Sequence, residues 1–390
     1  MSIEVTENGE VHIHGNERLS DRPRIGILTS GGDCPGLNAV LRATTKSAFW
    51  LGYDVVGFRG GFEGLVDPIR YQVLNPRNTA GILVQGGTIL GSTNKGRFAA
   101  RTGVSGRAEI DRALVEQVSE TVERLQLEGL IVVGGDGSLS TALQFHEAGI
   151  PVVGVPKTID NDLKCTAYTF GFNSAVLCCS DALDRLHTTA DSHDRVMVLE
   201  VMGRHTGWIA LHGGIAGGAD VILLPEIDWN YENIVAKIEE RKRLGKNFTL
   251  IVVAEGASLP GGSFVSDETG SGNKQVKLGG IGHIVREQLE PMIDQEVRCV
   301  VLGHLQRGGG PTTFDRVLAS QYGAHAVRLV VEKRFGKMVC SKPPEILDAP
   351  IADAVNQIRT VDPKGSAVQT ARAMGICLGD TPGYRNPFSI

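Results

Sequence analysis

Glycines, a carboxylate and a hydroxyl follow an apolar run in the stretch Gly134-Gly-Asp-Gly-Ser138. Glycine-rich turns ahead of a helix expose backbone N–H groups to phosphate, and Gly137 has no Cβ to hold a nucleotide phosphate away. Asp136 could bind Mg²⁺ directly or through water, or it could only cap the helix. The pattern predicts a phosphate-donor site, so phosphoryl transfer is the first hypothesis.

A pair of acids follows the next apolar run, in Pro156-Lys-Thr-Ile-Asp-Asn-Asp162. Asp160 and Asp162 are two residues apart, so their side chains point the same way from an extended backbone. Surface acids are usually solvated and inactive, but these two follow a buried strand, as the glycine loop does. We interpret them as part of a site, because a carboxylate can accept the proton of an attacking hydroxyl at neutral pH.

Glycines also follow two other predicted strands. The loop Thr29-Ser-Gly-Gly-Asp-Cys-Pro-Gly-Leu-Asn38 precedes a predicted helix, and it could bind phosphate or only form a turn. The stretch Glu200-Val-Met-Gly-Arg-His-Thr-Gly207 places Gly203 and Arg204 at a strand end. That arrangement suits an anionic substrate, although a turn with a surface arginine would have the same pattern.

A histidine and an arginine lie among glycines in Gly303-His-Leu-Gln-Arg-Gly-Gly-Gly310. His304 and Arg307 can both contact a phosphate monoester, and the guanidinium group is well shaped for bidentate contact. A lone histidine is more often structural than functional. Because Arg298 lies upstream and four glycines lie close by, we favour a phosphate site.

The elements that must position these loops alternate along the chain. Alternating strands and amphipathic helices predict an α/β fold with βαβ units and mainly parallel sheets. The predicted strands are 25–28, 55–58, 130–133, 152–155, 196–201, 221–224, 250–254 and 297–302. The predicted helices are 39–50, 110–127, 174–189, 231–244, 281–289 and 317–332.

Composition excludes several classes of protein. The 390 residues include 42% hydrophobic and 21% charged residues, as in ordinary globular proteins, and the net charge of -5 gives no support for nucleic-acid binding. No apolar run is long enough to predict a membrane span, and residues 1–22 show no secretory signal. The 7 cysteines form no C-x-x-C pair, which predicts reduced thiols in a cytoplasmic enzyme.

Taken together, the clusters resemble the phosphofructokinase family, from about Arg24 to Ala326. G-G-D-G alone also occurs in NAD kinases and lipid kinases. The ordered set with P-K-T-I-D-N-D, E-V-M-G-R and G-H-L-Q-R-G-G is highly specific. The resemblance implies an ATP-dependent 6-phosphofructokinase of glycolysis, which phosphorylates fructose 6-phosphate at C1 with Mg²⁺ as cofactor.

The resemblance also implies roles for single residues on the acceptor side. Asp160 matches the general base for the C1 hydroxyl, and Thr158 and Asp162 match neighbours of the transferred phosphoryl group. Thr158, Asp160 and Arg204 are the expected catalytic residues. The positions that match the sugar-phosphate site are Met202, Gly203, Arg204, Glu255, His304 and Arg307.

On the donor side, Asp136 matches the residue near the metal. Bacterial ATP enzymes of the family commonly carry an Arg-Phe pair whose arginine contacts the donor phosphates. In this chain either Lys95 or Arg97 takes that role, and the sequence does not decide between them. The other positions that match the nucleotide site are Gly32, Phe62, Gly137 and Ser138, with Phe62 where the family often has Tyr.

The phosphoryl donor is the main open alternative. Pyrophosphate users in the family typically have Lys at position 157 and tend to replace Gly137 by Asp. This chain combines the ATP-type Gly137 with the pyrophosphate-type Lys157. We favour ATP, because Gly137 decides whether a nucleotide fits, whereas either donor tolerates the charge of Lys157.

Other activities are less consistent with the motifs. An NAD kinase does not explain His304 and Arg307. A non-catalytic sugar-phosphate sensor needs neither Asp136 nor Asp160.

The length and the resemblance imply two Rossmann-like lobes with the active site between them. We expect a flexible arm at 1–22, a nucleotide-binding lobe at 23–170, completed by part of 306–356, and a sugar-phosphate-binding lobe at 171–305. A C-terminal segment at 340–390 has only a weak pattern.

The resemblance further implies a homo-oligomer with shared active sites, and a tetramer is the expected form. Arg195 and Arg298 match arginines that enter the site of an adjacent subunit. An allosteric enzyme is also implied. Arg42, Lys46, Asp220 and Lys246 fall at or near effector positions, and His187 stands where an Arg is usual.

Overall fold

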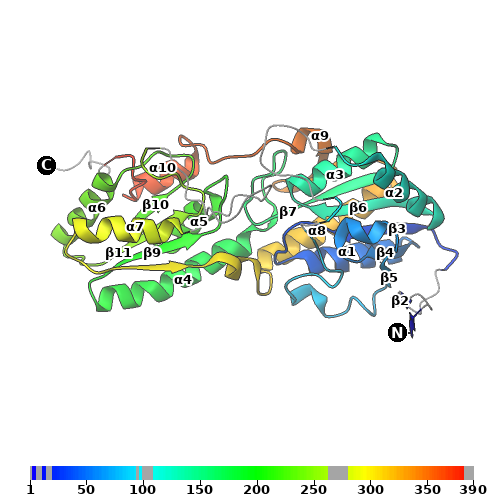
Figure 1. The fold of residues 1–390 in the computed structure, drawn as a ribbon, viewed down its shortest axis with the longest axis horizontal. Coiled ribbons are helices and arrows are strands. Elements are labelled where there is room, and N and C mark those ends of the chain that lie inside the picture. The colour runs from blue at the N-terminus through cyan, green and yellow to red at the C-terminus, as the bar shows by residue number, and fades with distance from the viewer. Residues whose placement is uncertain are drawn as a thin grey trace. The chain divides into compact units, whose positions relative to one another are not determined.

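The structure is a computed structural model that describes residues 2–5, 11–14, 20–93, 96–98, 109–261 and 280–381. The chain divides into two compact units, which we describe separately. Unit 1 comprises residues 1–159, 163–171 and 307–358, and unit 2 comprises 160–162, 172–306 and 359–390. The predicted α/β class with mainly parallel sheets is confirmed (Figure 1).

Unit 1 is built on a sheet whose central strands are parallel. The strand order is β14-β13-β7-β6-β3-β4-β5, with β8 paired to β7, and only β5 and β14 run antiparallel to their neighbours. The strands are β3 (Arg24–Thr29), β4 (Asp54–Phe58), β5 (Tyr71–Leu74), β6 (Leu127–Gly134), β7 (Val152–Thr158), β8 (Phe170–Gly171), β13 (Lys337–Lys342) and β14 (Glu345–Pro350).

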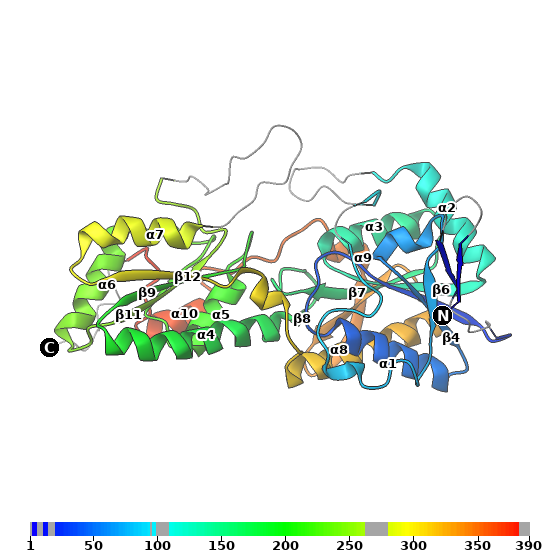
Figure 2. The same cartoon turned by 60° about the horizontal axis from the view of Figure 1, so that its bottom comes forward.

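Helices cover both faces of this sheet. Figure 2 shows α1 (Leu37–Trp50) and α8 (Thr313–Val331) on one face, and α3 (Asp136–Glu147) on the other. The apolar side chains of the central parallel strands β3, β4, β6 and β7 are buried because they face helices on both sides, as parallel sheets require. The shorter elements of unit 1 are α2 (Arg112–Arg124), α9 (Ile351–Ala354), η1 (Gly61–Leu65) and η2 (Ile82–Val84).

Unit 2 contains a four-stranded parallel sheet in the order β10-β11-β9-β12. Figure 2 shows α7 on one face of this sheet and α4 and α5 on the other. Its strands are β9 (Val196–Val201), β10 (Val221–Leu223), β11 (Thr249–Ala254) and β12 (Val297–Val301). Its helices are α4 (Phe172–Ser192), α5 (Trp208–Ala216), α6 (Tyr231–Arg243), α7 (Ile281–Leu289), α10 (Ser366–Ala373), η3 (Glu290–Met292) and η4 (Gly303–Arg307). The last residue of η4, Arg307, is assigned to unit 1.

Two segments differ from the sequence-based description. Within 1–22, β1 (Ser2–Val5) and β2 (Val11–His14) form an antiparallel pair. The weakly patterned segment after 340 contributes β14 and α9 to unit 1, whereas its residues from 359 onward belong to unit 2. All seven cysteines are free, and no helix in the described part of the chain is long and apolar enough to cross a membrane.

Candidate functional site

The glycine loops of unit 1 meet at one edge of its sheet. β3, β6 and β7 are parallel neighbours, so the loops that follow them leave the sheet side by side. The Ser30 N–H donates a hydrogen bond to the Val133 carbonyl (2.9 Å). A Cβ on Gly31 would lie 3.3 Å from Ser138 Oγ and 3.5 Å from Lys157 Nζ. The structure therefore brings the Gly31 loop, Ser138 and Lys157 together.

Two cations hold the Gly32 loop. Lys157 is 4% exposed and donates from Nζ to the Gly32 carbonyl. Arg307 donates from Nη1 to the Asp33 carbonyl (3.2 Å), and a Cβ on Gly32 would lie 2.8 Å from the same Nη1. Arg307 is thus placed against the donor loop of unit 1, although the sequence assigned it to the sugar phosphate. Its role stays a prediction.

The helices that follow these loops begin on glycine. Gly36 (φ 110°) precedes α1 and Gly135 precedes α3, and among the described residues no side chain caps either helix. The first N–H groups of a helix lack intrahelical partners and carry partial positive charge. These two helix starts therefore suit an anionic ligand such as a phosphate chain.

Asp136, the predicted metal ligand, lies in the first turn of α3, directly after the glycine loop. Its Oδ1 accepts a hydrogen bond from the Asn356 N–H (2.8 Å), and burial raises its pKa while that bond opposes the shift. No group of three or more His, Cys, Asp or Glu side chains within the described ranges could hold a metal alone. A single carboxylate fits Mg²⁺ only together with the phosphates of a donor, which is how Mg²⁺ is commonly bound in kinases.

The remaining predicted donor residues lie on neighbouring loops. Phe62 is 4% exposed, and its ring packs against Phe98 and Phe145 in the core, with centroids 5.7 and 5.5 Å away. Arg97 forms an ion pair with Glu63 (Nη2 to Oε2, 2.9 Å). Lys95 lies outside the described residues. Contact of Phe62 or Arg97 with a nucleotide stays a prediction.

The predicted sugar-phosphate residues of unit 2 gather at the carboxyl edge of its sheet. Met202, Gly203 and Arg204 follow β9, Glu255 follows the adjacent β11, and His304 follows β12 on the other side of β9. Their loops are joined by hydrogen bonds from the Glu255 N–H to the Val201 carbonyl (2.9 Å) and from the Gly256 N–H to the Gly203 carbonyl (3.1 Å). The site of unit 2 therefore combines a cation, a carboxylate and an imidazole.

The backbone conformation at position 203 requires glycine. Its φ is 142°, where L side chains are rarely found, and a Cβ would lie 2.6 Å from the Thr206 carbonyl. Any other residue here would move the backbone of Met202 and Arg204.

The acids of the D-N-D loop belong to unit 2, whereas Thr158, two residues earlier, ends β7 in unit 1. The Thr206 hydroxyl donates to the Asp160 carbonyl (3.4 Å), which ties the loop to the segment after Arg204. Burial and Arg204 lower the pKa of His205, and Asp162 opposes that shift. His205, which the sequence analysis did not single out, therefore belongs to the same electrostatic environment as Asp162.

Arg195 and Arg298 lie at the opposite edge of the unit 2 sheet. Arg195 precedes β9, Arg298 is the second residue of β12, and both pair with Glu296. β9 has 6 residues, and a strand rises about 3.3 Å per residue, so this edge is about 20 Å from the Met202 edge. Within unit 2, the structure does not bring these arginines to the other predicted substrate residues.

Polar residues that the sequence analysis left without a role support the site of unit 2, and two of them, Gln306 and Glu200, are buried. Gln306, 1% exposed, accepts a hydrogen bond from the Met202 N–H (2.7 Å). Glu200 accepts from Gly280 and Gly282 at the start of α7, and Glu226 accepts from Gly207 at the start of α5. The one sequence signal for Gln306 and Glu200 is that they lie inside the motifs G-H-L-Q-R-G-G and E-V-M-G-R.

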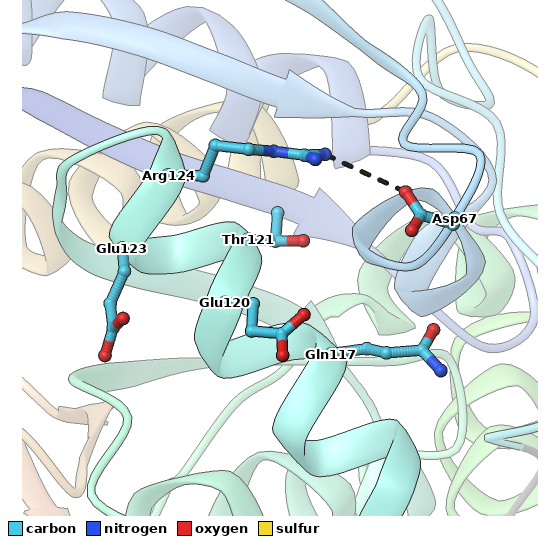
Figure 3. Close-up of a pocket in the computed structure, with 6 residues that line it drawn as sticks. All are labelled: Asp67, Gln117, Glu120, Thr121, Glu123 and Arg124. Atoms are coloured by element: carbon cyan, nitrogen blue, oxygen red, sulfur yellow. Dashed lines mark ion pairs between the residues drawn. The ribbon is translucent and has the colours of Figure 1, made fainter.

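A pocket lies beside α2. Figure 3 shows it between α2 and the loop of Asp67, with an ion pair between Arg124 and Asp67 (3.8 Å). None of the predicted site residues lines it. The lining residues are Asp67, Gln117, Glu120, Thr121, Glu123 and Arg124.

Comparison with known proteins assigns the family. The family model described as "Phosphofructokinase" matches residues 24–330. A Chloroflexus aurantiacus protein named "ATP-dependent 6-phosphofructokinase" is 51% identical over 361 residues, which are 93% of this chain and 99% of that relative. The chain belongs to the phosphofructokinase family, and the predicted resemblance is confirmed.

Other relatives widen the comparison. A Streptomyces coelicolor protein named "Pyrophosphate--fructose 6-phosphate 1-phosphotransferase" is 45% identical over 343 residues, which are 87% of this chain and 96% of that relative. The crystal structure of Pichia pastoris phosphofructokinase in the T-state is 30% identical with a TM-score of 0.74. That match covers 93% of this chain but 37% of the Pichia chain.

Proposed function

We propose that this chain transfers the terminal phosphoryl group of ATP to the C1 hydroxyl of D-fructose 6-phosphate, with Asp160 as the general base. Three relatives that are 50–51% identical to this chain over 93% of its length are named ATP-dependent 6-phosphofructokinase, which is this activity. They confirm the predicted ATP-dependent, glycolytic kinase activity. The residue roles below are our inference.

The observation that carries the residue roles is the difference between the two sheet edges. The edge of unit 1 offers uncapped helix starts and glycine loops, which suit the phosphates of a donor. The edge of unit 2 offers Arg204, Glu255 and His304, which suit a phosphorylated sugar with hydroxyls. A kinase needs one set of groups of each kind.

The chemistry follows from these groups. Asp160 accepts the proton of the C1 hydroxyl as its oxygen attacks the γ-phosphorus of ATP. The bond from that phosphorus to the bridging oxygen breaks, ADP leaves, and fructose 1,6-bisphosphate forms. Arg204 and Thr158 stabilise charge on the transferred group, and positioning with electrostatics supplies most of the rate.

Mg²⁺ is the proposed cofactor, with Asp136 as the protein carboxylate that holds it. When bound, it neutralises charge on the donor phosphates. Gly137 and Ser138 present backbone to the donor, and Gly32 lines the neighbouring loop, where Lys157 and Arg307 fix the backbone.

Pyrophosphate is the second candidate donor. A relative 45% identical to this chain is named a pyrophosphate-dependent phosphotransferase, and Lys157 lies within the donor loops. We retain ATP because Gly137 leaves room for a nucleotide.

We also propose a cytoplasmic, allosteric homotetramer with shared sites. The position of Arg195 and Arg298 supports shared sites, because about 20 Å separates them from the substrate residues of their own unit. Free thiols agree with a reducing compartment. At the proposed effector positions, Asp220 pairs with Arg241, and the rings of His187 and Phe248 meet edge to face.

The test is product formation by the purified protein from fructose 6-phosphate and MgATP. We expect fructose 1,6-bisphosphate, and we expect Asp160→Asn to lower kcat by about 10²–10⁴ because a general base is lost. An analogue that lacks the C1 hydroxyl should not react. If Asp160→Asn lowers kcat by less than about tenfold, Asp160 is not the base.

A further inference from the structure

The segment that begins at Arg359 holds the backbone of the loop that carries Asp160, and both belong to unit 2. The Arg359 guanidinium donates to the Asn161 carbonyl from Nη2 (2.9 Å) and from Nε (3.2 Å). The Arg359 backbone N–H donates to the Asp162 carbonyl (2.8 Å). One residue therefore restrains two successive carbonyls of the D-N-D loop.

Arg359 is itself fixed by Trp208. The indole Nε1–H donates to the Arg359 carbonyl (2.9 Å), and the guanidinium carbon lies 5.0 Å from the Trp208 ring centroid. A cation over an indole face is attracted by the ring quadrupole, and the stack keeps the guanidinium plane from rotating away. Trp208 is the first residue of α5, so the restraint begins on a helix.

A second tie fastens the same segment. The Val361 N–H donates to Glu226 Oε1 (2.9 Å), and the same carboxylate accepts from the Gly207 N–H (3.0 Å). Gly207 closes the stretch that contains Met202 and Arg204. The C-terminal segment thus contacts both the base loop and the end of the substrate loop within unit 2.

The base loop has an unusual backbone that requires such restraint. Asn161 is 3% exposed and has φ 51°, in the left-handed region, which is uncommon outside glycine although Asn adopts it more readily than most residues. A conformation of this kind persists only where its surroundings over-determine it. Because Asn161 separates Asp160 from Asp162, a rotation of its peptide would move both carboxylates.

We propose that Arg359 is a positioning residue for phosphoryl transfer, which fixes the Asn161 and Asp162 carbonyls so that the Asp160 carboxylate faces the hydroxyl it deprotonates. The inference rests on the proposed role of Asp160. Arg359 acts through the loop and need not touch either substrate. A displacement of about 1 Å at a reacting group can cost about 10² in rate, so we expect a loss in kcat rather than in affinity.

The first test compares two arginines of the same segment. Arg359→Ala should lower kcat by about 10- to 100-fold, while the KM values for ATP and fructose 6-phosphate change less than about threefold. Arg372 lies on α10 and pairs with Asp380 (Nη1 to Oδ1, 3.0 Å) rather than with the base loop, so Arg372→Ala is the matched control and should keep kcat. Guanidinium ion added to Arg359→Ala should restore part of the rate. Equal kcat values for the two variants would overturn the proposal.

The second test separates this proposal from the role of Asp160. If Arg359 acts through Asp160, Arg359→Ala should lower kcat much less in an Asp160→Asn background than in the wild type. Full additivity of the two losses would overturn the positioning role. A near-normal kcat for Asp160→Asn alone would instead overturn the proposed base.

A milder variant covers the case in which Arg359→Ala does not fold. Arg359→Lys keeps a cation near Trp208 but cannot donate through a planar fork to Asn161. We expect it to fold and to lower kcat by a smaller factor. Unchanged kcat in Arg359→Lys would contradict the need for the guanidinium fork.

Discussion

The helices that follow the functional loops begin differently in the two units. In unit 1, α1 and α3 start on glycines, and in the described part of the chain no side chain caps them. In unit 2, the buried Glu200 and the partly exposed Glu226 accept hydrogen bonds from backbone N–H groups at the starts of α7 and α5. A carboxylate there cancels the partial positive charge that an anion would otherwise meet.

The difference shows how each unit can recognise phosphate. Unit 1 leaves these two helix starts without a side-chain cap, so backbone N–H groups can bind the donor, while Asp136 in the first turn of α3 is left for the metal. Unit 2 fills its helix starts with its own carboxylates, so the sugar phosphate must be bound by side chains such as Arg204 and His304. Recognition by backbone requires glycine, whereas recognition by side chains tolerates larger residues.

Arg307 tests whether the two units recognise phosphate differently, and its replacement by Ala has the largest expected effect on substrate binding. It contacts the Asp33 carbonyl of unit 1, yet the sequence assigns it to the sugar phosphate. A charge-assisted contact contributes about 1.5–3 kcal/mol, so Arg307→Ala should raise the KM for fructose 6-phosphate about 10- to 150-fold and the KM for ATP far less. Steady-state kinetics with each substrate varied would decide. A larger rise in the KM for ATP would make Arg307 a donor-loop residue.

Gly137→Asp sharpens the donor side of the comparison. Like charges about 4 Å apart repel by about 4 kcal/mol at an effective dielectric near 20, and solvent and Mg²⁺ reduce this, so ATP-driven turnover should fall about 10- to 100-fold. Gly137→Ala is the control, because it adds bulk without charge and should lose less. Pyrophosphate-driven turnover should be spared. A loss of equal size with both donors would mean that the residue does not select the nucleotide.

Mixed oligomers test whether unit 2 borrows cations from a neighbour. Arg195→Ala and Asp160→Asn, each inactive alone, should complement after joint dissociation and reassociation. With random mixing in two-fold pairs, about a quarter of the sites would contain both intact residues, so activity should approach a quarter of the wild-type value. No recovery in mixtures that reassociate fully would rule out shared sites.

The smallest effect concerns acid sensitivity in unit 2. Burial and Arg359 lower the pKa of His212, so the unfolded state binds more protons and stability is lost as the pH falls below about 6.5. His212→Gln should therefore lose less unfolding free energy than the wild type between about pH 7.5 and about pH 5.5, by at most about 1.4 kcal/mol. Denaturant titrations at both pH values measure this. Identical losses in both proteins would show that His212 does not contribute.

The apolar strands were predictable because their pattern is local. The runs at 130–133 and 152–155 lie inside β6 and β7, and the glycine loop and the acid pair follow them as expected. β13, β14 and α10 were not predicted, because their exposed or mixed residues carry no clear period.

The supporting contacts could not be predicted from spacing. Gln306, Glu226 and Arg359 act through hydrogen bonds to backbone atoms that lie far away in the sequence. No local pattern encodes such partners. The contact of Lys157 with the Gly32 carbonyl likewise depends on the pairing of β7, β6 and β3.

The most direct test of the account is the turnover of the unmodified protein with ATP and with pyrophosphate, side by side, at saturating fructose 6-phosphate and Mg²⁺. Gly137 predicts that fructose 1,6-bisphosphate forms faster from ATP. A preference for pyrophosphate would contradict the weight given to Gly137 over Lys157, and formation of no bisphosphate with either donor would contradict the proposed reaction itself.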